Sequence, residues 1–146
     1  MSLRPLYLLD TNICLYLMKH QPPQVAERFA RCLVGEVLIS AITAAELEVG
    51  VIASGDQAEH NRLALQRFLL EVPVAPFDGR AAGAYRPMRL ASRERRRDAL
   101  DKLIAAHALA LGVTLVTNNL ADFRIYPGLD VENWVAEAGS GEDPQG

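Results

Sequence analysis

Three carboxylates stand near points where helices are expected to begin. Asp10 follows a short apolar run, Glu46 lies in a helical pattern after a second apolar run, and Asp101 lies near the start of a strongly periodic helical segment. Carboxylate oxygens are hard ligands, and without a cluster of His or Cys they favour Mg²⁺ or Mn²⁺ over zinc. A cation held in this way activates water and neutralises charge on a phosphate group during hydrolysis.

Helix capping could explain each acid separately. Asp10 or Asn12 could cap the first helix, and Thr43 with Glu46 has the spacing of a capping box. Asp98 is the expected N-cap of the later helix. For any one acid taken alone, a cap is therefore the simpler interpretation.

Position on the helix argues against a mere cap for Glu46. At about 100° per residue, Ile42, Ala45, Val49 and Ala53 share one apolar face, and Glu46 falls within that face. We therefore expect Glu46 to be buried. A buried carboxylate needs a cation, a network of donors or a raised pKa.

Asp101 is a better site candidate than Asp98, because it lies at the edge of the apolar stripe of its helix, roughly 60° closer to the core. That stripe is expected to comprise Leu100, Leu103, Ile104, His107 and Leu111. A lone histidine in such a stripe is usually a satisfied core residue, and we favour that interpretation over proton transfer or ligand orientation.

Predicted strands and helices alternate along the chain. Pro22 and Pro23 end the first helix, and Pro87 is expected to kink or split a helix that begins at Asp78. Strands are expected at 6–9, 37–39, 72–75 and 113–117, and further helices at 13–18, 41–53, 58–70 and 100–111. This pattern predicts an α/β fold with a central parallel sheet flanked by helices on both faces.

A parallel sheet also gives the reason to combine the acids into one site. The carboxyl ends of its strands, and the helix starts that follow them, line one crevice. Asp10, Glu46, Asp101 and the segment after Thr117 are all expected at that edge. Carboxylates gathered there would repel one another unless a cation neutralised them.

Length and composition fit one globular domain. The chain has 146 residues, half of them hydrophobic, and we expect a domain over residues 1–135 with a flexible tail at 136–146. Cys14 and Cys32 belong to no CxxC motif and are expected to be reduced thiols of a cytoplasmic protein. The longest apolar runs are far shorter than the ~18 residues of a membrane span.

Arginines are concentrated in one stretch although the net charge is −3. Against the single acid Glu94, this stretch contains Arg80, Arg86, Arg89, Arg93, Arg95, Arg96 and Arg97. A solvated helix face and a contact surface for phosphates explain such a cluster equally well.

Five segments, taken in order, closely resemble the PIN-domain toxins of the VapC type. They are LLDTN at 8–12, SAITAAEL at 40–47, DKLIAAHA at 101–108, LVTNN at 115–119, and PGL at 127–129 with ENW at 132–134. The resemblance covers nearly the whole chain. It implies a Mg²⁺- or Mn²⁺-dependent endoribonuclease whose RNA targets are commonly tRNA or ribosomal RNA.

The resemblance also implies partners. Such a toxin is neutralised by a VapB-type antitoxin, whose tail occupies the acidic cleft and often brings an arginine into it. Toxins of this kind are usually homodimers.

The family's three best-kept acids carry over to Asp10, Glu46 and Asp101, which would hold the metal. A fourth acid commonly follows the last strand of such domains. Here Asn119 occupies one form of that position, whereas Asp122 aligns with the other form and is our fourth catalytic candidate. Whether a second metal binds is left open.

Other polar residues are expected to support the site or to contact RNA. The supporting residues are Thr11, Asn12, Thr117 and Asn119, and the RNA-binding candidates are Arg86, Arg93, Arg95, Arg96 and Arg97.

Two alternatives have weaker support. Asp10 with Asn12 faintly resembles the nucleophile motif of haloacid-dehalogenase-like phosphotransferases, but Asn12 stands where a second Asp belongs and Glu46 would have no role. A PIN-like module that binds RNA or protein without cutting is compatible with the missing acid at Asn119.

Overall fold

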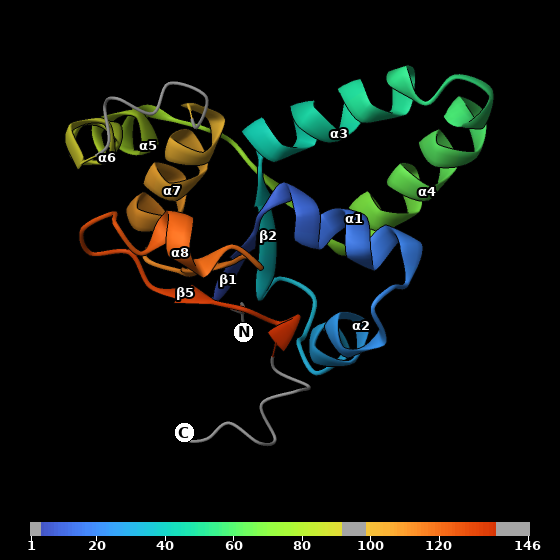
Figure 1. Cartoon of the computed structure of the whole chain (residues 1–146), viewed down its shortest axis with the longest axis horizontal. Helices are drawn as coiled ribbons and strands as arrows, with labels where there is room; N and C mark the ends of the chain where they lie inside the picture. Colours follow the sequence, from blue (N-terminus) through green and yellow to red (C-terminus); the bar gives the residue numbers. More distant parts are fainter. Residues whose placement is uncertain (1–3, 92–98, 137–146) are drawn as a thin grey trace.

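The computed structural model describes residues 4–91 and 99–136. Its five-stranded sheet has the order β3-β2-β1-β4-β5, with every neighbouring pair parallel (Figure 1). The strands are β1 (Tyr7–Leu9), β2 (Val37–Ser40), β3 (Val74–Ala75), β4 (Thr114–Val116) and β5 (Val131–Glu132). The predicted α/β class with a parallel sheet is confirmed.

Helices fill every connection between consecutive strands. They are α1 (Thr11–Lys19) and α2 (Pro23–Ala30) before β2; α3 (Ala41–Ala53), the 3₁₀ turn η1 (Gly55–Gln57) and α4 (Ala58–Glu71) before β3; α5 (Gly79–Gly83), α6 (Tyr85–Ala91) and α7 (Ala99–Leu111) before β4; and α8 (Leu120–Phe123) before β5. The bounds of α3 are those expected from the sequence.

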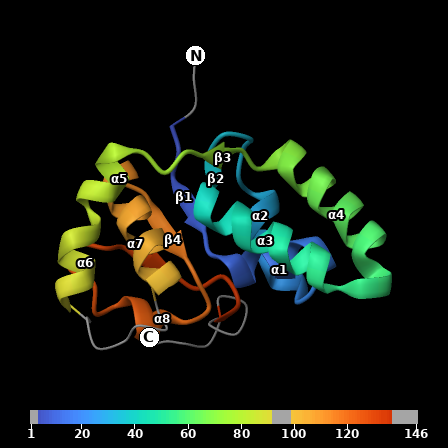
Figure 2. The same cartoon turned by 90° about the horizontal axis from the view of Figure 1, so that it is seen from above.

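Side chains on the two faces of the sheet belong to two separate apolar clusters. Leu9 and Ile39 pack with residues of α1 to α4, whereas their neighbours Leu8 and Leu38 pack with residues of α6 to α8. Figure 2 shows α5, α6 and α7 on one side of the strands and α1, α3 and α4 on the other. Helices therefore flank both faces, as predicted.

The buried face of α3 differs from the expected one. Thr43, Leu47 and Val51 are buried, whereas Ala45, Val49 and Ala53 are exposed. This helix is apolar around most of its circumference, and Val49 and Ile52 are 66% and 78% exposed. Periodicity alone therefore could not select the face that meets the sheet.

The buried surface of α7 is also broader than expected. Leu100 and Leu111 are 45% and 39% exposed, whereas Ile104 and His107 are buried as predicted. Small residues and a lysine complete the buried set, which adds Lys102, Ala105, Ala106 and Ala108. A helix packed on several sides buries more than one stripe, because neighbours meet it from α5, α6 and the sheet.

Two prolines act differently from their expected roles. Pro23 does not only end the preceding helix but is the first residue of α2, a position where the missing N–H costs nothing. The predicted split of the helix that begins at Asp78 is confirmed, but it falls at Ala84, the C-cap of α5, and Pro87 lies within the first turn of α6.

No helix within the described ranges has the length and apolar character needed to cross a membrane.

Candidate metal-dependent nuclease site

Asp10 lies directly after the central strand β1 and is only 7% exposed. Its Oδ1 accepts a hydrogen bond from the backbone N–H of Ile13 at 3.0 Å, so Asp10 is the N-cap of α1. Asp10, one of the two candidate caps of the first helix, is therefore its N-cap, and its side chain is also buried.

The environment of Asp10 disfavours its charged form. Burial raises the pKa of this carboxyl above its ordinary value, and the nearby Glu46 carboxylate raises it further. A hydrogen bond from Thr117 and the backbone N–H groups of Ile13 and Asn12 act in the opposite direction but are outweighed. A cation at this point would relieve both the desolvation and the repulsion.

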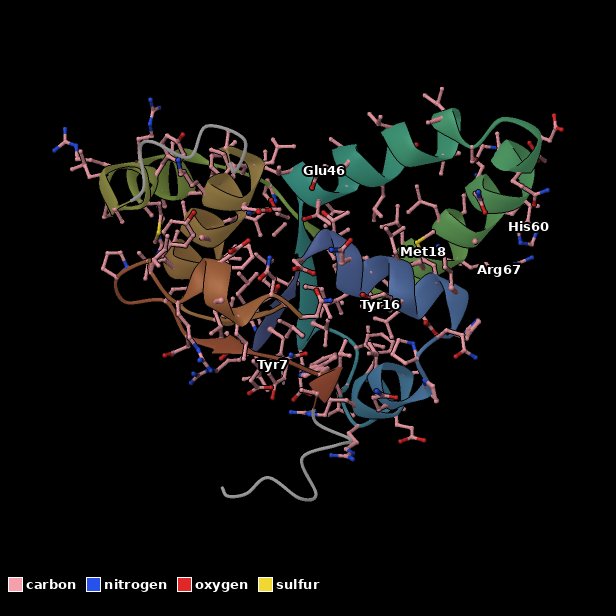
Figure 3. The ribbon with its side chains drawn as sticks, viewed as in Figure 1. Tyr7, Tyr16, Met18, Glu46, His60 and Arg67 are labelled. Atoms are coloured by element: carbon pink, nitrogen blue, oxygen red, sulfur yellow. The ribbon has the colours of Figure 1, made fainter. Side chains whose placement is uncertain are left out.

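Glu46 is half-buried, not fully buried as expected, and faces α1 across the sheet edge (Figure 3). Its Oε1 accepts a hydrogen bond from Thr11 Oγ1 at 2.5 Å. The predicted capping box is wrong, because Ser40 is the N-cap of α3 and Glu46 bonds to another helix. Thr11, predicted to support the site, therefore contacts one of the three candidate acids.

The segment after β4 reaches the same edge. Thr117 is fully buried, donates toward Asp10 and accepts a hydrogen bond from the backbone N–H of Asn119 at 3.0 Å. The amide Nδ2 of Asn119 donates to Asp122 Oδ2 at 2.6 Å. Asn119 and Asp122 thus form one polar unit at the start of α8, while the exposed Asn12 contributes its backbone N–H near Asp10.

Asp101 lies in the first turn of α7 and is partly buried. Since α7 leads into β4, its first turn is at the edge where the strands end. Among residues 4–91 and 99–136, however, no group of three or more His, Cys, Asp or Glu side chains is placed to hold a metal ion. The structure couples Asp10 with Glu46, and Asp101 does not complete a three-acid cluster with them.

The donor set still fits a hard divalent cation. Mg²⁺ keeps several waters and is commonly bound through one or two carboxylates. Asp10 and Glu46 supply two interacting carboxylates, and burial together with the charge of Glu46 raises the pKa of Asp10. The hydroxyls of Thr11 and Thr117 hold those carboxylates in place.

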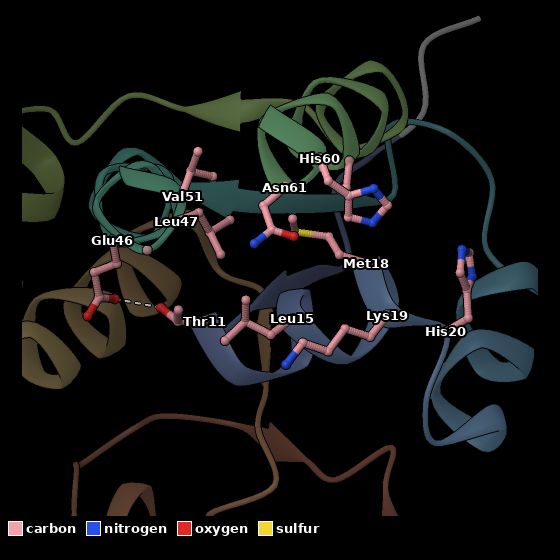
Figure 4. A pocket seen from close by; sticks show the side chains of 12 residues that line it. Thr11, Leu15, Met18, Lys19, His20, Glu46, Leu47, Val51, His60 and Asn61 are labelled. Atoms are coloured by element: carbon pink, nitrogen blue, oxygen red, sulfur yellow. Dashed lines mark hydrogen bonds between the residues drawn. The ribbon is translucent and has the colours of Figure 1, made fainter. Parts of the chain in front are cut away.

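A groove begins at Thr11 and Glu46, and it was not predicted from the sequence. It has a volume of about 590 Å³ and runs between α1, α3 and α4 (Figure 4). Thr11 and Glu46 lie at one end, and Leu15, Met18 and Leu47 contribute apolar walls. These residues are distant in sequence, so no local motif could have announced the groove.

A second hollow of about 530 Å³ continues over α1, α2 and α4. It shares Met18, His20 and Ala64 with the groove. The groove and the hollow together form a largely apolar channel that leads away from Glu46.

Of the arginines proposed to bind RNA, Arg86 is exposed on α6. Arg93, Arg95, Arg96 and Arg97 lie outside the described residues, as does Asp98, the predicted N-cap of α7. Most of the predicted tail, residues 137–146, also lies outside them.

Comparisons with known proteins agree on one family. Residues 7–128 match the PIN domain. The tRNA(fMet)-specific endonuclease VapC of Shigella flexneri is 35% identical over 130 residues, which cover 88% of this chain and 97% of that protein. Ribonuclease VapC2 of Rickettsia felis is 35% identical over 135 residues, covering 88% and 98%.

Solved structures give the same result. The crystal structure of VapBC2 from Rickettsia felis bound to a DNA fragment from their promoter has a TM-score of 0.79 at 34% identity, covering 88% of this chain and 98% of that one. These matches rule out the phosphotransferase alternative and favour a nuclease over a non-catalytic module. The chain belongs to the PIN-domain family and, within it, to the VapC ribonucleases.

Proposed function

We propose that this chain is the toxin of a type II toxin–antitoxin pair and cleaves RNA with a Mg²⁺ or Mn²⁺ ion. The observation that carries the proposal is the buried Asp10 carboxylate beside Glu46, at the carboxyl edge of a sheet that has the VapC ribonuclease fold. Two coupled acids in a poorly solvated position are costly without a cation.

Each acid has a proposed role. Asp10 and Asp101 would hold the ion, and Glu46 would hold it or a water bound to it. When bound, the cation supplies water activation and charge neutralisation at the scissile phosphate. Thr11 orients Glu46, Thr117 orients Asp10, and Asp122 together with Asn119 takes the place of the usual fourth acid.

Hydrolysis by an activated water breaks the bond between phosphorus and the 3′ oxygen. The products are then a 5′-phosphate and a 3′-hydroxyl. Products ending in a 2′,3′-cyclic phosphate, formed without metal, would contradict this mechanism.

The substrate is proposed to be tRNA or ribosomal RNA, and the name of the Shigella flexneri relative supports tRNA. Arg86, Arg93, Arg95, Arg96 and Arg97 would guide the RNA backbone toward a cleft that is negative until the metal enters.

A VapB-type antitoxin is the proposed protein partner, because the structural neighbours include VapBC complexes. Its tail would place a basic side chain beside Asp10 and Glu46. The adjoining apolar channel offers Leu15 and Met18 to the rest of that chain. A homodimer is proposed on family grounds.

The decisive experiment is cleavage of a labelled total tRNA pool by the purified protein in Mn²⁺ or Mg²⁺ against EDTA. Asp10→Asn keeps an N-cap for α1 and serves as the folded control. Metal-dependent cuts that vanish in this variant would establish the nuclease. RNA binding without metal and without cleavage, by folded protein free of antitoxin, would favour the non-catalytic module.

The partner is tested separately by co-expression with the product of a small gene immediately upstream. Co-purification that is lost in Leu15→Asp but kept in Ile125→Asp would support the channel as the contact. Both variants add one charge, and Ile125 does not line the channel.

A further inference from the structure

A buried hydrogen bond joins the two helices that carry Glu46 and Asp101. His107 Nδ1 on α7 lies 2.8 Å from Ser40 Oγ, across 67 residues of sequence. Both residues are almost completely buried, His107 at 1% and Ser40 at 0% exposure. The contact is therefore shielded from competing water.

Ser40 is also the residue that starts α3. Its Oγ accepts a hydrogen bond from the backbone N–H of Ile42 at 3.0 Å, which makes it the N-cap. A single oxygen thus meets both the first turn of α3 and the imidazole of α7. A shift of α7 relative to Ser40 would therefore also disturb the first turn of α3.

The two acids lie at similar distances along their helices from this contact. Glu46 is six residues after Ser40, and Asp101 is six residues before His107. At about 1.5 Å per residue, each acid lies roughly 9 Å along a rigid helix from the bond. The bond therefore ties together the two helices that carry Glu46 and Asp101.

Burying His107 costs more free energy than burying an apolar side chain at the same core position. Its Nε2 is buried without a hydrogen-bond partner in the described part of the chain. Phe77 meets the ring edge-on at a centroid distance of 5.3 Å, a packing that another aromatic ring could also make. Burial lowers the pKa of His107, so the imidazole is neutral near pH 7. Its polar contacts distinguish it from a phenyl ring: the bond to Ser40 Oγ and a hydrogen bond with the backbone of Pro76.

We propose that the bond between His107 and Ser40 is a positioning contact that sets the separation of Glu46 and Asp101 for metal binding. His107 touches neither the substrate nor the ion in this role. The inference rests on the proposed metal-dependent function.

Two substitutions at residue 107 separate positioning from stability. His107→Phe keeps a ring against Phe77 but removes Nδ1. His107→Asn places an amide atom close to where Nδ1 lies but leaves a cavity that lowers the Tm. Mn²⁺ affinity is measured by calorimetry on the folded proteins, alongside the Tm without metal and kcat/KM for RNA cleavage.

We expect Mn²⁺ affinity to fall about tenfold or more in His107→Phe, in the range found when the outer support of a metal site is lost. His107→Asn should bind Mn²⁺ within a few-fold of wild type although its Tm is lower. A merely structural histidine would give the opposite result, with affinity following the Tm.

Ser40 provides an independent test if His107→Phe fails to fold. Ser40→Ala removes the hydroxyl, whereas Ser40→Thr retains it; only the alanine variant should lose Mn²⁺ affinity. Adding Ser40→Ala to a folded His107→Phe protein should cause little further loss of Mn²⁺ affinity. The first substitution has already removed the bond between residues 40 and 107, so the two effects should not add.

The outcomes distinguish this inference from the proposed function. Wild-type protein that binds no Mn²⁺ and cuts no RNA would overturn both. Wild-type protein that binds Mn²⁺, together with folded His107→Phe or Ser40→Ala variants of unchanged affinity, would overturn the positioning role alone.

Discussion

The Thr11 hydroxyl donates a hydrogen bond to the Glu46 carboxylate across 35 residues of sequence, at 2.5 Å. Thr11 is the first residue of α1 and adjoins Asp10, so the bond holds the second acid close to the first. Holding two carboxylates close together costs free energy. The Thr11 hydroxyl is a neutral donor, so it holds Glu46 near Asp10 without cancelling the negative charge of Glu46.

Replacing Thr11 tests this arrangement. Thr11→Val keeps the shape but removes the donor, so Glu46 should be free to turn away from Asp10. We expect kcat/KM for RNA cleavage to fall about tenfold or more. Thr11→Ser should retain most of the activity, because it keeps the hydroxyl. Equal activity in the valine and serine variants would show that the bond has no functional role.

Asp10→Asn should make the metal-free protein more stable at pH 7. Because the folded-state pKa of Asp10 is raised, the native state binds more protons than the unfolded state, and stability falls as pH rises through that pKa. The advantage of the variant should therefore shrink as pH falls toward 3.8, the ordinary value. Urea denaturation in EDTA at several pH values measures it.

The exposed Asp130→Asn is the matched control and should show a smaller change. Mn²⁺ at about 100 times its Kd should stabilise wild type by roughly 2.7 kcal/mol and the Asp10→Asn variant by far less. A wild type that is more stable than Asp10→Asn in EDTA at pH 7 would contradict the explanation.

Asn119→Asp tests whether the chain can regain a fourth acid. The change replaces the amide donor that lies 2.6 Å from Asp122 with a second negative charge. Without metal, we expect a loss of about 1 kcal/mol in the free energy of unfolding. Mg²⁺ should recover that loss in Asn119→Asp but not in Asn119→Ala, as followed by the Tm. Equal Mg²⁺ responses of the two variants would exclude a cation between these residues.

Gly50→Ala should stabilise the protein. Gly50 lies inside α3, and a Cβ added there meets nothing within 4 Å. Alanine lowers the entropy cost of forming the helix, so we expect a gain of about 0.5–1 kcal/mol by urea denaturation. Gly55→Ala is the contrasting variant, since Gly55 has a φ of +59° and should lose stability. A loss at both positions would indicate that α3 packs differently.

The proposed RNA-binding arginines should act through phosphates. Combined replacement of Arg95, Arg96 and Arg97 by Ala should weaken RNA binding and flatten its salt dependence, by a slope of about 0.7 for each phosphate contact to a single strand. Fluorescence anisotropy in an Asp10→Asn background avoids cleavage. Arg62→Ala is the control, because Arg62 pairs with Glu59 on the exposed face of α4. An unchanged slope in the triple variant would remove these arginines from the RNA surface.

Much of the fold could be predicted because its signals are local. Ser54 and Gly55 mark the end of α3, and Gly112 adopts a φ of +70° directly after α7. The place of Asp10 at the carboxyl end of a strand could be predicted from the apolar run before it, whereas its burial was not predicted. Proline was ambiguous, since the sequence around Pro23 permits a helix to end or to begin there.

The rest depended on contacts between distant residues. The stripe formed by Thr43, Leu47 and Val51 could not be separated from other apolar faces of α3 without knowing where the sheet lies. Nothing near Glu46 in the sequence indicates Thr11 as its partner. Ser40 could have been recognised as an N-cap, but its bond to His107 lies 67 residues away.

The central place of β1 means that residues synthesised much later in the chain complete the surroundings of Asp10. Asp10 donates its backbone N–H to the carbonyl of Val116 at 3.0 Å, and Thr117 completes the surroundings of its carboxylate. While only the residues before β4 have been synthesised, Val116 and Thr117 are therefore still missing from the surroundings of Asp10. The acidic edge around Asp10 therefore forms only after β4 and the segment that follows it have joined the sheet.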